Sequence, residues 1–279
     1  MKPSHSSHPF YEVPSTTSKE RACDAVINQP LVEEIPLALS YNGINYAVMM
    51  VTPVDLEAFV LGFSLSEKIV DHATELKSVT FHSQEEGIEA SIDISNRAFY
   101  ALKQQRRQLA GRTGCGICGK EALEHLSLRD LNILPQTPLP ESHLFKGLRN
   151  TLSEHQPLAQ ISGALHSAAF INDKGDIVMN YEDVGRHNAL DKLIGGLLQK
   201  KQDMSSGAIV MTSRCSFELV QKVIRCGGRT LATLSPPTAK AVEMARLYNL
   251  NLLHLTYQGA VRVYACPTHL NGAISSENG

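Results

Sequence analysis

Segments with strand patterns alternate with segments with helix patterns between about residues 165 and 265. In the strand segments, short apolar runs are bounded by turn residues, whereas in the helix segments apolar residues recur every three or four positions. We predict strands over 165–171, 176–180, 208–212, 230–234, 251–257 and 261–265, and helices over 186–200, 217–225 and 238–248. Such alternation places helices on the faces of a sheet, so it predicts a layered α/β domain.

The first half of the chain has a less regular pattern, which indicates a smaller α+β unit. We predict a strand over 44–51, a hairpin over 77–82 and 87–94, and a helix over 96–109. A further helix is expected to start at Thr52 and run to about Lys68. Thr52 can cap this helix, and Pro53 suits its first position.

Changes in composition suggest where the parts of the chain begin and end. The first 22 residues are rich in Ser, Thr, Pro and His, which is typical of a mobile tail, and Pro135 to Pro140 reads as a linker. The predicted parts are a tail over 1–22, an N-terminal α+β subdomain over 23–134, a linker and helix over 135–156, and a C-terminal α/β subdomain over 157–279.

The composition favours a cytoplasmic protein. The formal net charge of −2 predicts no bulk attraction to nucleic acid or to a membrane surface. Six cysteines without regular spacing in 279 residues do not resemble a disulfide framework, which favours a reducing compartment. The first residues lack an apolar signal region, and no apolar run is as long as a membrane span.

Residues 111–119, Gly-Arg-Thr-Gly-Cys-Gly-Ile-Cys-Gly, place two thiols in a glycine-rich loop. Glycine has no Cβ, so this loop can turn sharply and direct backbone N–H groups toward an anionic sulfur. Arg112 and Lys120 flank the pair, and positive charge lowers the pKa of a thiol. Cys115 and Cys118 are therefore candidates for a reactive thiolate that exchanges sulfur through covalent adducts.

Three uses of this CxxC motif compete. A zinc site needs two more ligands, and the chain has no second CxxC, although His166 or His187 could complete one. Thioredoxin-like redox chemistry is a second use, but no proline lies inside the pair. The third use is covalent carriage of sulfur as a persulfide. The motif alone leaves all three open.

Several blocks together resemble the formate dehydrogenase accessory sulfurtransferase (FdhD) family. The run over 182–192, Glu-Asp-Val-Gly-Arg-His-Asn-Ala-Leu-Asp-Lys, is the most specific of them after the cysteine loop. The other matching blocks are 52–57, 62–67, Ser213-Arg214 with Ser216 and Glu218, and Ser235 with Pro237-Thr238. The resemblance covers the chain except for about residues 1–30 and 135–155.

The resemblance implies a cytidine-deaminase-like fold, a three-layer α/β/α core, here with a smaller N-terminal α+β subdomain. It does not imply deamination. Zinc deaminases use an H-x-E motif followed by P-C-x-x-C. In this chain the CxxC precedes the candidate histidines, and His187-Asn188-Ala189 stands in place of H-x-E.

The resemblance also implies a function. Family members take sulfur from a cysteine desulfurase as a persulfide and pass it to a molybdenum or tungsten cofactor with two pterin guanine dinucleotides. The cofactor then enters formate dehydrogenase. Cys115 matches the carrier position and Cys118 the assisting one. A homodimer with no permanently bound metal is expected. The alternatives are a cofactor-binding chaperone without sulfur chemistry and a zinc-binding CxxC protein.

The residues expected to bind the cofactor lie in two places, and guanosine diphosphate is the expected partial mimic. In the family a short segment before the last strand contacts the cofactor. It corresponds to Leu255, Thr256, Tyr257, Gln258, Gly259 and Ala260. This segment lacks the Lys or Arg of relatives, and Arg262 lies two residues beyond it.

In the 182–192 run, Asp183 is expected to accept hydrogen bonds from guanine and Arg186 to pair with phosphate, with His187 near the sulfur. The plainer interpretation gives such side chains a structural hydrogen-bonding role. Cys226 and Cys266 are expected to behave as small buried apolar groups.

Overall fold

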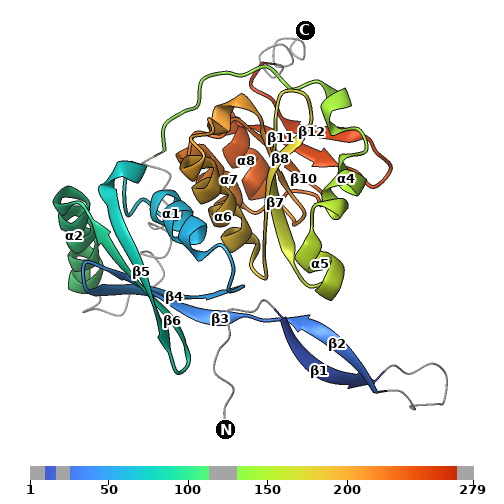
Figure 1. The fold of residues 1–279 in the computed structure, drawn as a ribbon. Coiled ribbons are helices and arrows are strands. Elements are labelled where there is room, and N and C mark those ends of the chain that lie inside the picture. The colour runs from blue at the N-terminus through green and yellow to red at the C-terminus, as the bar shows by residue number, and fades with distance from the viewer. Residues whose placement is uncertain (1–9, 17–25, 113–130, 269–279) are drawn as a thin grey trace.

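The computed structural model describes residues 10–16, 26–112 and 131–268. They form two sheets and a separate two-stranded ribbon (Figure 1). In the ribbon, β1 (Phe10–Thr16) pairs antiparallel with β2 (Val26–Val32), and the pair projects from the side of the molecule (Figure 1). Strand β1 falls within residues 1–22, where the sequence predicted a tail and no strand.

The smaller sheet has four strands in the order β4-β3-β6-β5. They are β3 (Ile35–Tyr41), β4 (Ile44–Val51), β5 (Leu76–Gln84) and β6 (Gly87–Ile94). Strands β3 and β6 run parallel, whereas β4 and β5 are antiparallel to their neighbours. Helices α1 (Leu56–Ser66) and α2 (Asn96–Arg112) and the 3-10 turn η1 (Ala73–Glu75) complete this unit, and apolar side chains of both helices share one core with the strands.

Helix α1 begins at Leu56, not at the predicted position after Thr52. Asp55 precedes it in the left-handed region, with φ 55° and ψ 35°, and so separates it from Thr52. The Thr52 hydroxyl accepts a hydrogen bond from the backbone N–H of Val184 at 3.1 Å instead of capping a helix. A contact with a segment more than a hundred residues away therefore replaces the local cap.

The larger sheet has six strands in the order β12-β11-β10-β9-β7-β8. They are β7 (His166–Ile171), β8 (Ile177–Asp183), β9 (Ala208–Met211), β10 (Thr230–Thr233), β11 (Asn251–Leu255) and β12 (Val261–Ala265). Strands β9, β10 and β11 are parallel. Strand β7 is antiparallel to both of its neighbours, and β12 is antiparallel to β11.

Helices cover both faces of this sheet. On one face lie α6 (Arg186–Gln199), α7 (Phe217–Arg225) and α8 (Ala239–Leu247), packed on inward residues such as Phe170 and Ile209. On the other face η4 (Ser142–Phe145) and α4 (Leu148–Glu154) pack on the alternate residues, such as Ala169 and Val210. The short elements α5 (Pro157–Ser162) and η5 (Met204–Ser206) lie in connections. The predicted α/β class is confirmed, with two mixed sheets.

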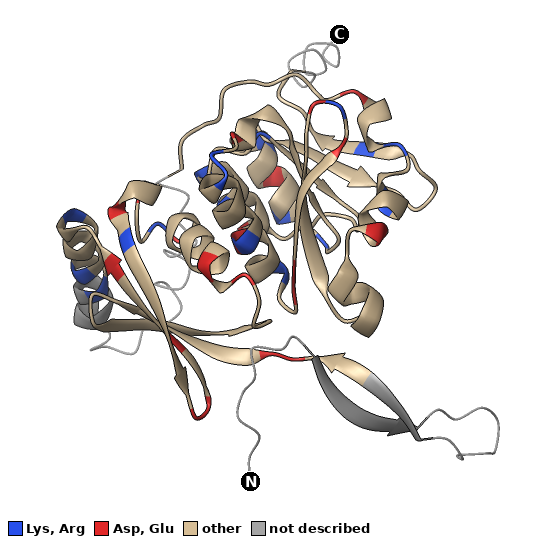
Figure 2. Cartoon of the chain, in the orientation of Figure 1, with Lys and Arg blue, Asp and Glu red and all other residues tan. Residues whose placement is uncertain are grey.

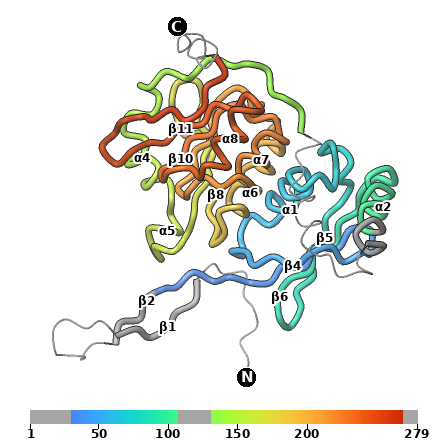
Figure 3. The backbone as a smooth tube through the Cα atoms, turned by 180° about the vertical axis from the view of Figure 1, so that it is seen from behind, coloured from blue at the N-terminus to red at the C-terminus, as the bar shows by residue number. Residues whose placement is uncertain are grey.

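The two sheets are joined where α1 packs on α6 (Figures 1 and 3). A Cβ atom built on Gly62 of α1 would lie 1.8 Å from the carbonyl oxygen of Asp191, and one on Gly195 of α6 would lie 1.8 Å from that of Ala58. Each glycine therefore lets the backbone of the other helix approach where no side chain fits. This close packing places the end of β4 against the start of α6.

Lys, Arg, Asp and Glu residues are spread over both units (Figure 2). On α2, Lys103 and Arg106 are exposed, and the Lys103 ammonium lies 4.1 Å from the centre of the Phe99 ring. Of the helices in the described ranges, none has the length and apolar character needed to cross a bilayer.

Candidate functional site

The carboxyl ends of β8, β9, β10 and β11 meet at one edge of the large sheet. Strand β8 has the same direction as β9 because β7 is antiparallel to both. In open α/β sheets, ligands bind outside the carboxyl ends of the strands. Residues 182–187, 213–218 and 255–260 follow these ends, so the topology brings the predicted blocks to a single edge. From β8 to β11 there are four strand spacings, or about 19 Å.

Asp183, at the end of β8, is fully buried and bonded on both carboxylate oxygens. Its Oδ2 lies 2.7 Å from Lys192 Nζ and accepts the backbone N–H of Thr52 at 3.0 Å. Its Oδ1 accepts the backbone N–H of Gly185 and the amide of Asn188, each at 2.9 Å. In this arrangement Asp183 joins β8, α6 and the N-terminal unit. The geometry does not support the predicted guanine contact, because both oxygens are engaged and shielded from solvent.

Lys192 extends this buried network. It is fully buried, and its ammonium also donates to the carbonyl oxygens of Thr52 and Glu182 at 3.1 and 3.2 Å. The Glu182 carboxylate accepts the backbone N–H groups of Leu158 and Ala159 at 3.0 and 2.8 Å. Burial raises the pKa of Glu182, although these two bonds and Lys192 oppose the rise. Glu182, Asp183 and Lys192 of the predicted motif therefore make buried contacts that hold the structure together.

Arg186 and His187 form the first turn of α6 and are half-buried. Arg186 Nε and His187 Nε2 are buried and have no hydrogen-bond partner among the described residues. Burial, aided by the nearby cations Arg186 and Lys222, lowers the pKa of His187 to about 4. His187 is therefore neutral at pH 7. A helix N-terminus with an arginine and a neutral imidazole suits an anion.

Glu218, in the first turn of α7, lies close enough to Arg186 and His187 for both to lower the pKa of its carboxyl group. Burial raises the pKa of Glu218, but the Ser216 hydroxyl, a backbone N–H, His187 and Arg186 together leave it below its ordinary value. At the start of β7, burial and Arg186 lower the pKa of His166. The motif Ser216-x-Glu218 was part of the resemblance, and the structure places it beside the start of α6.

Residues 256–260 of the predicted segment connect β11 and β12, and Tyr257 to Ala260 are exposed. Leu255, predicted to contact the cofactor, is instead the buried last residue of β11. Thr256 closes it: its N–H donates to the Ala260 carbonyl at 2.9 Å, and its hydroxyl accepts the Ala260 N–H at 3.0 Å. Gly259, with φ +81°, adopts a conformation that favours glycine. The Tyr257 side chain is 88% exposed. The N–H groups of Tyr257 and Gln258 make no hydrogen bond to a described residue.

Arg149 of α4, which sequence reasoning missed, holds this turn. Its Nη2 donates to the carbonyl oxygens of Leu234 and Leu255 at 2.8 and 2.9 Å, linking the ends of β10 and β11. Its guanidinium carbon lies 5.3 Å from the centre of the Tyr257 ring. Arg149 lies 106 positions before Leu255, so no local pattern in the sequence could associate the two.

Cys115 and Cys118 lie outside the described residues. In the described ranges, no group of three or more His, Cys, Asp or Glu side chains is arranged to hold a metal ion. Cys266 is buried, as predicted, whereas Cys226, also predicted to be buried, is half-buried; Cys215 is buried as well.

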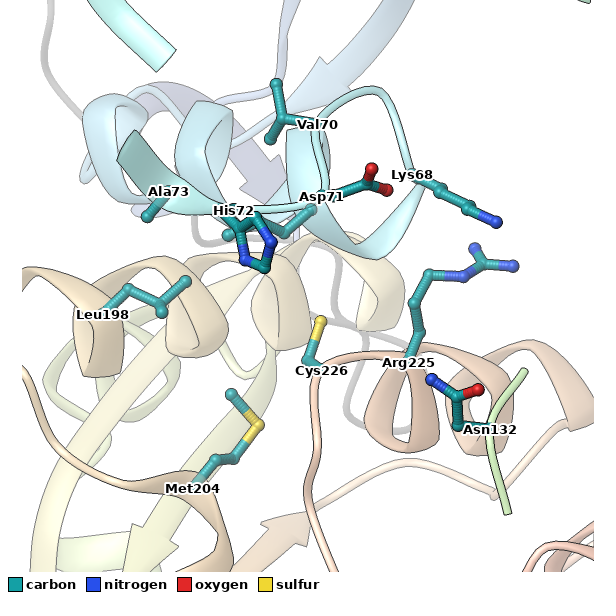
Figure 4. Close-up of a pocket in the computed structure, with 11 residues that line it drawn as sticks. Lys68, Val70, Asp71, His72, Ala73, Asn132, Leu198, Met204, Arg225 and Cys226 are labelled. Atoms are coloured by element: carbon teal, nitrogen blue, oxygen red, sulfur yellow. The ribbon is translucent and has the colours of Figure 1, made fainter. Parts of the chain in front are cut away.

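A cavity of about 590 Å³ lies toward the other edge of the large sheet (Figure 4). Its walls include Lys68 and Val70 to Ala73 of the N-terminal unit, and Leu198, Met204 and Cys226, which precede strands β9 and β10. Burial raises the pKa of the Cys226 thiol to about 12, so this thiol is protonated at pH 7. None of the predicted cofactor residues lines this cavity.

Comparison with known proteins gives a consistent result. Residues 32–271 match the model of the FdhD/NarQ family. The chain is 44% identical over 245 residues to a sulfur carrier protein FdhD from Cupriavidus necator, covering 88% of this chain and 85% of that protein. It is 41% identical over 261 residues to the protein of the same name from Acinetobacter baylyi, covering 91% and 93%.

A solved structure also resembles this chain. It is a protein from Desulfotalea psychrophila described as a formate dehydrogenase accessory protein, with a TM-score of 0.72 and 22% sequence identity. The match covers 93% of this chain and 98% of that one. At this identity the likeness concerns the fold, and it extends over both sheets.

Proposed function

Because this chain belongs to the FdhD/NarQ family, we propose that it is a sulfurtransferase of formate dehydrogenase maturation. It takes persulfide sulfur from a cysteine desulfurase and passes it to the molybdenum bis(molybdopterin guanine dinucleotide) cofactor before insertion into formate dehydrogenase. The observation that carries this proposal is the identity above 40% over most of the chain to two proteins named sulfur carriers. The chain acts in the cytoplasm, as a homodimer.

The cysteine loop supplies the chemistry. The Cys115 thiolate attacks the terminal sulfur of the donor's persulfide, the donor's S–S bond breaks, and the donor leaves as a thiolate. The product is a persulfide on Cys115, and no net oxidation or reduction occurs. Cys118 then assists by attacking the inner sulfur of that persulfide. This step releases hydrosulfide toward the cofactor and leaves a disulfide, which a cellular dithiol reduces to two thiols.

The carboxyl edge of the large sheet supplies a place for the cofactor. Its extent of about 19 Å matches an elongated ligand better than a single small molecule. At the α6 end, Arg186 and the neutral His187 each have a buried nitrogen without a partner, which suits an anionic group. At the other end, the turn 255–260 has two backbone N–H groups without a bond to a described residue. Asp183 supports this edge from inside and does not contact guanine.

The three-layer core supports a further part of the proposal, a cytidine-deaminase-like arrangement of the large domain. Helices cover both faces of its mixed sheet. Fold likeness does not bring deaminase chemistry with it.

Transfer of sulfur to the purified protein tests the sulfur chemistry. After incubation with a cysteine desulfurase and cysteine, intact mass spectrometry is expected to show one added sulfur atom, which a reductant removes. Cys115→Ala should lose this addition, and Cys226→Ala, a matched cysteine in another part of the chain, should keep it. An added sulfur on Cys115→Ala would refute the assignment of the carrier.

Two further measurements separate the alternatives. If the double variant Cys115→Ala/Cys118→Ala still supports maturation of formate dehydrogenase, the protein is a cofactor-binding chaperone without sulfur chemistry. If the purified protein contains one zinc per chain, and Cys118→Ala loses that zinc, the CxxC motif is a metal site.

A further inference from the structure

The turn 255–260 contains no basic residue, but Arg149 reaches it from α4. Two carbonyl oxygens, at 2.8 and 2.9 Å, accept hydrogen bonds from its Nη2 and fix the plane of the guanidinium against the end of β11. The Tyr257 ring lies over this guanidinium at 5.3 Å. A cation that the sequence of the turn lacks is therefore supplied by a distant helix.

The remaining N–H groups of Arg149 differ in their access to solvent. Its Nε is buried without a partner. Its Nη1 makes no hydrogen bond to a described residue and is not among the buried unpartnered atoms, so it reaches solvent. An arginine held in place by one nitrogen presents the other with little loss of conformational freedom on binding. Nη1 is thus a preorganised donor beside an exposed turn.

A second cation adds to the positive potential at this end of the edge. Burial lowers the pKa of His254 on β11, and the charges of Arg262 and Arg149 lower it further, so both guanidinium groups lie near this imidazole. Arg262 is exposed on β12, paired in register with His254, whereas Arg149 is the one bonded to Leu255 at the start of the turn. The geometry therefore favours Arg149 as the anion contact.

We propose that Arg149 binds the diphosphate of a guanine nucleotide arm through Nη1 while the outer face of Tyr257 stacks on the base. This inference rests on the proposed function, because it assigns residues to cofactor binding. Tyr257 suits stacking because its ring is 88% exposed and is backed on one side by a cation. The N–H groups of Tyr257 and Gln258 provide further donors for phosphate oxygens.

Binding of guanosine and of guanosine diphosphate, measured by calorimetry, separates phosphate contact from base contact. Arg149→Gln keeps an N–H donor on the side chain but carries no charge. It should weaken guanosine diphosphate binding about tenfold and guanosine binding less than about twofold. Arg149→Lys, which keeps the charge, should lose about threefold or less for the diphosphate. The matched control Arg262→Gln should change neither ligand more than about twofold.

A reporter at the turn tests the stacking. The chain contains no tryptophan, so Tyr257→Trp introduces a single indole. Both ligands should quench its fluorescence, because a base that stacks on the ring contacts the indole directly. Tyr257→Ala should weaken both ligands by a similar factor of about ten or more.

Several results would overturn the inference. If Arg149→Gln binds guanosine diphosphate as well as the wild type does, the inference is refuted. If Arg262→Gln also binds the diphosphate more weakly, Arg262 is the phosphate contact instead. Equal losses of both ligands by Arg149→Gln would mean that Arg149 only holds the turn. If the Arg149 variants fail to fold, the salt dependence of binding by the wild type gives the test. The affinity for guanosine diphosphate should fall as the salt concentration rises, and the affinity for guanosine should not. Equal salt dependence for the two ligands would contradict the phosphate contact.

The proposed function fails in a different way. If the wild type binds neither guanosine diphosphate nor guanosine, the assignment of this edge to a guanine cofactor is wrong whatever Arg149 does. If binding is normal in Arg149→Gln and Cys115 still gains sulfur, only the role of Arg149 is refuted.

Discussion

The two ends of the candidate edge are built in opposite ways. At the β8–α6 end, Asp183 is fully buried and each of its carboxylate oxygens is bonded, including an ion pair with the buried Lys192. At the β11–β12 end, Tyr257 is 88% exposed and backbone N–H groups of the turn lack a partner in the described chain. At the first end the polar groups bond to one another in the interior, and at the second end they face solvent.

This difference shows that a distinctive sequence motif can have a structural role or a binding role. The run 182–192 holds the N-terminal unit, β8 and α6 together through Asp183, Asn188 and Lys192. Arg186 and His187 of the same run each have a buried nitrogen without a partner among the described residues. In the turn, Tyr257 to Ala260 are exposed, and no buried ion pair of the described chain involves them. We therefore expect substitutions at the first end to change stability and those at the second to change binding.

Asp183→Ala should have the largest effect on stability. It leaves the ammonium of Lys192 buried without its carboxylate, and removing one partner of a buried pair costs about 3–5 kcal/mol. The measurement is the free energy of unfolding in urea. The control is Asp173→Ala, an exposed aspartate on the β7–β8 hairpin, which should change stability by about 0.5 kcal/mol or less. A loss below about 1 kcal/mol for Asp183→Ala would show that Asp183 is not the structural junction described above.

Gly62→Ala should have the next largest effect. Its new methyl group would lie 1.8 Å from the carbonyl oxygen of Asp191, so α1 and α6 must move apart. We expect a loss of about 2–3 kcal/mol in the free energy of unfolding. Leu61→Ala, a half-buried neighbour on the same helix, is the comparison, because it removes volume and forces no helix apart. Wild-type stability of Gly62→Ala would mean that the two helices are not packed this closely.

The sequence predicted the strands and helices of the second half well because their patterns are local. Helix α7 and strand β12 have the predicted bounds, 217–225 and 261–265. Strand β3 was missed, although Ile35, Leu37, Leu39 and Tyr41 alternate with less buried residues over its first half and would have revealed it. The predicted start of helix α1 was wrong because a contact with a distant segment replaced the local cap. Thr52 and Pro53 form a good helix start, but Thr52 is bound to β8 and to the residue that follows it.

The candidate site was predicted in part for the same reason. The blocks 182–187, 213–218 and 255–260 were recognised from the sequence, and parallel topology brings them to one edge. Whether a given side chain faces the ligand or the interior depends on its neighbours in space. Asp183 faces the interior because Lys192 and the backbone of Thr52 bind it there. Arg149 carries no local signal, since its partners Leu234 and Leu255 are 85 and 106 residues away. The roles of Cys115 and Cys118 stay predictions.

The acid dependence of stability tests the environment of His187. Its pKa in the folded protein, about 4, lies below the ordinary value of 6.5, so between these values the unfolded chain binds more protons. Its contribution to stability is therefore complete at pH 7 and is lost as the pH falls through 6.5 toward 4. We expect about 1–2 kcal/mol, allowing for its partial exposure.

The check compares unfolding free energies at pH 7 and pH 5. The decrease should be smaller in His187→Gln than in the wild type, and His143→Gln, an exposed histidine on η4, should behave like the wild type. Titration of the His187 ring followed by NMR gives the same answer directly. An inflection near 6.5 would contradict a desolvated imidazole at this end of the edge.

Tyr257→Ala should have the smallest effect on stability. The ring is 88% exposed and lies 5.3 Å from the Arg149 guanidinium carbon, an interaction that contributes about 0.5 kcal/mol at an exposed site. The free energy of unfolding should therefore change by less than about 1 kcal/mol, while the affinity for guanosine falls about tenfold or more. Asp183→Ala should be the reverse, provided that binding is measured on its folded fraction. If Tyr257→Ala instead unfolds the protein as readily as Asp183→Ala does, both ends of the edge are structural, and a cofactor site must be sought elsewhere.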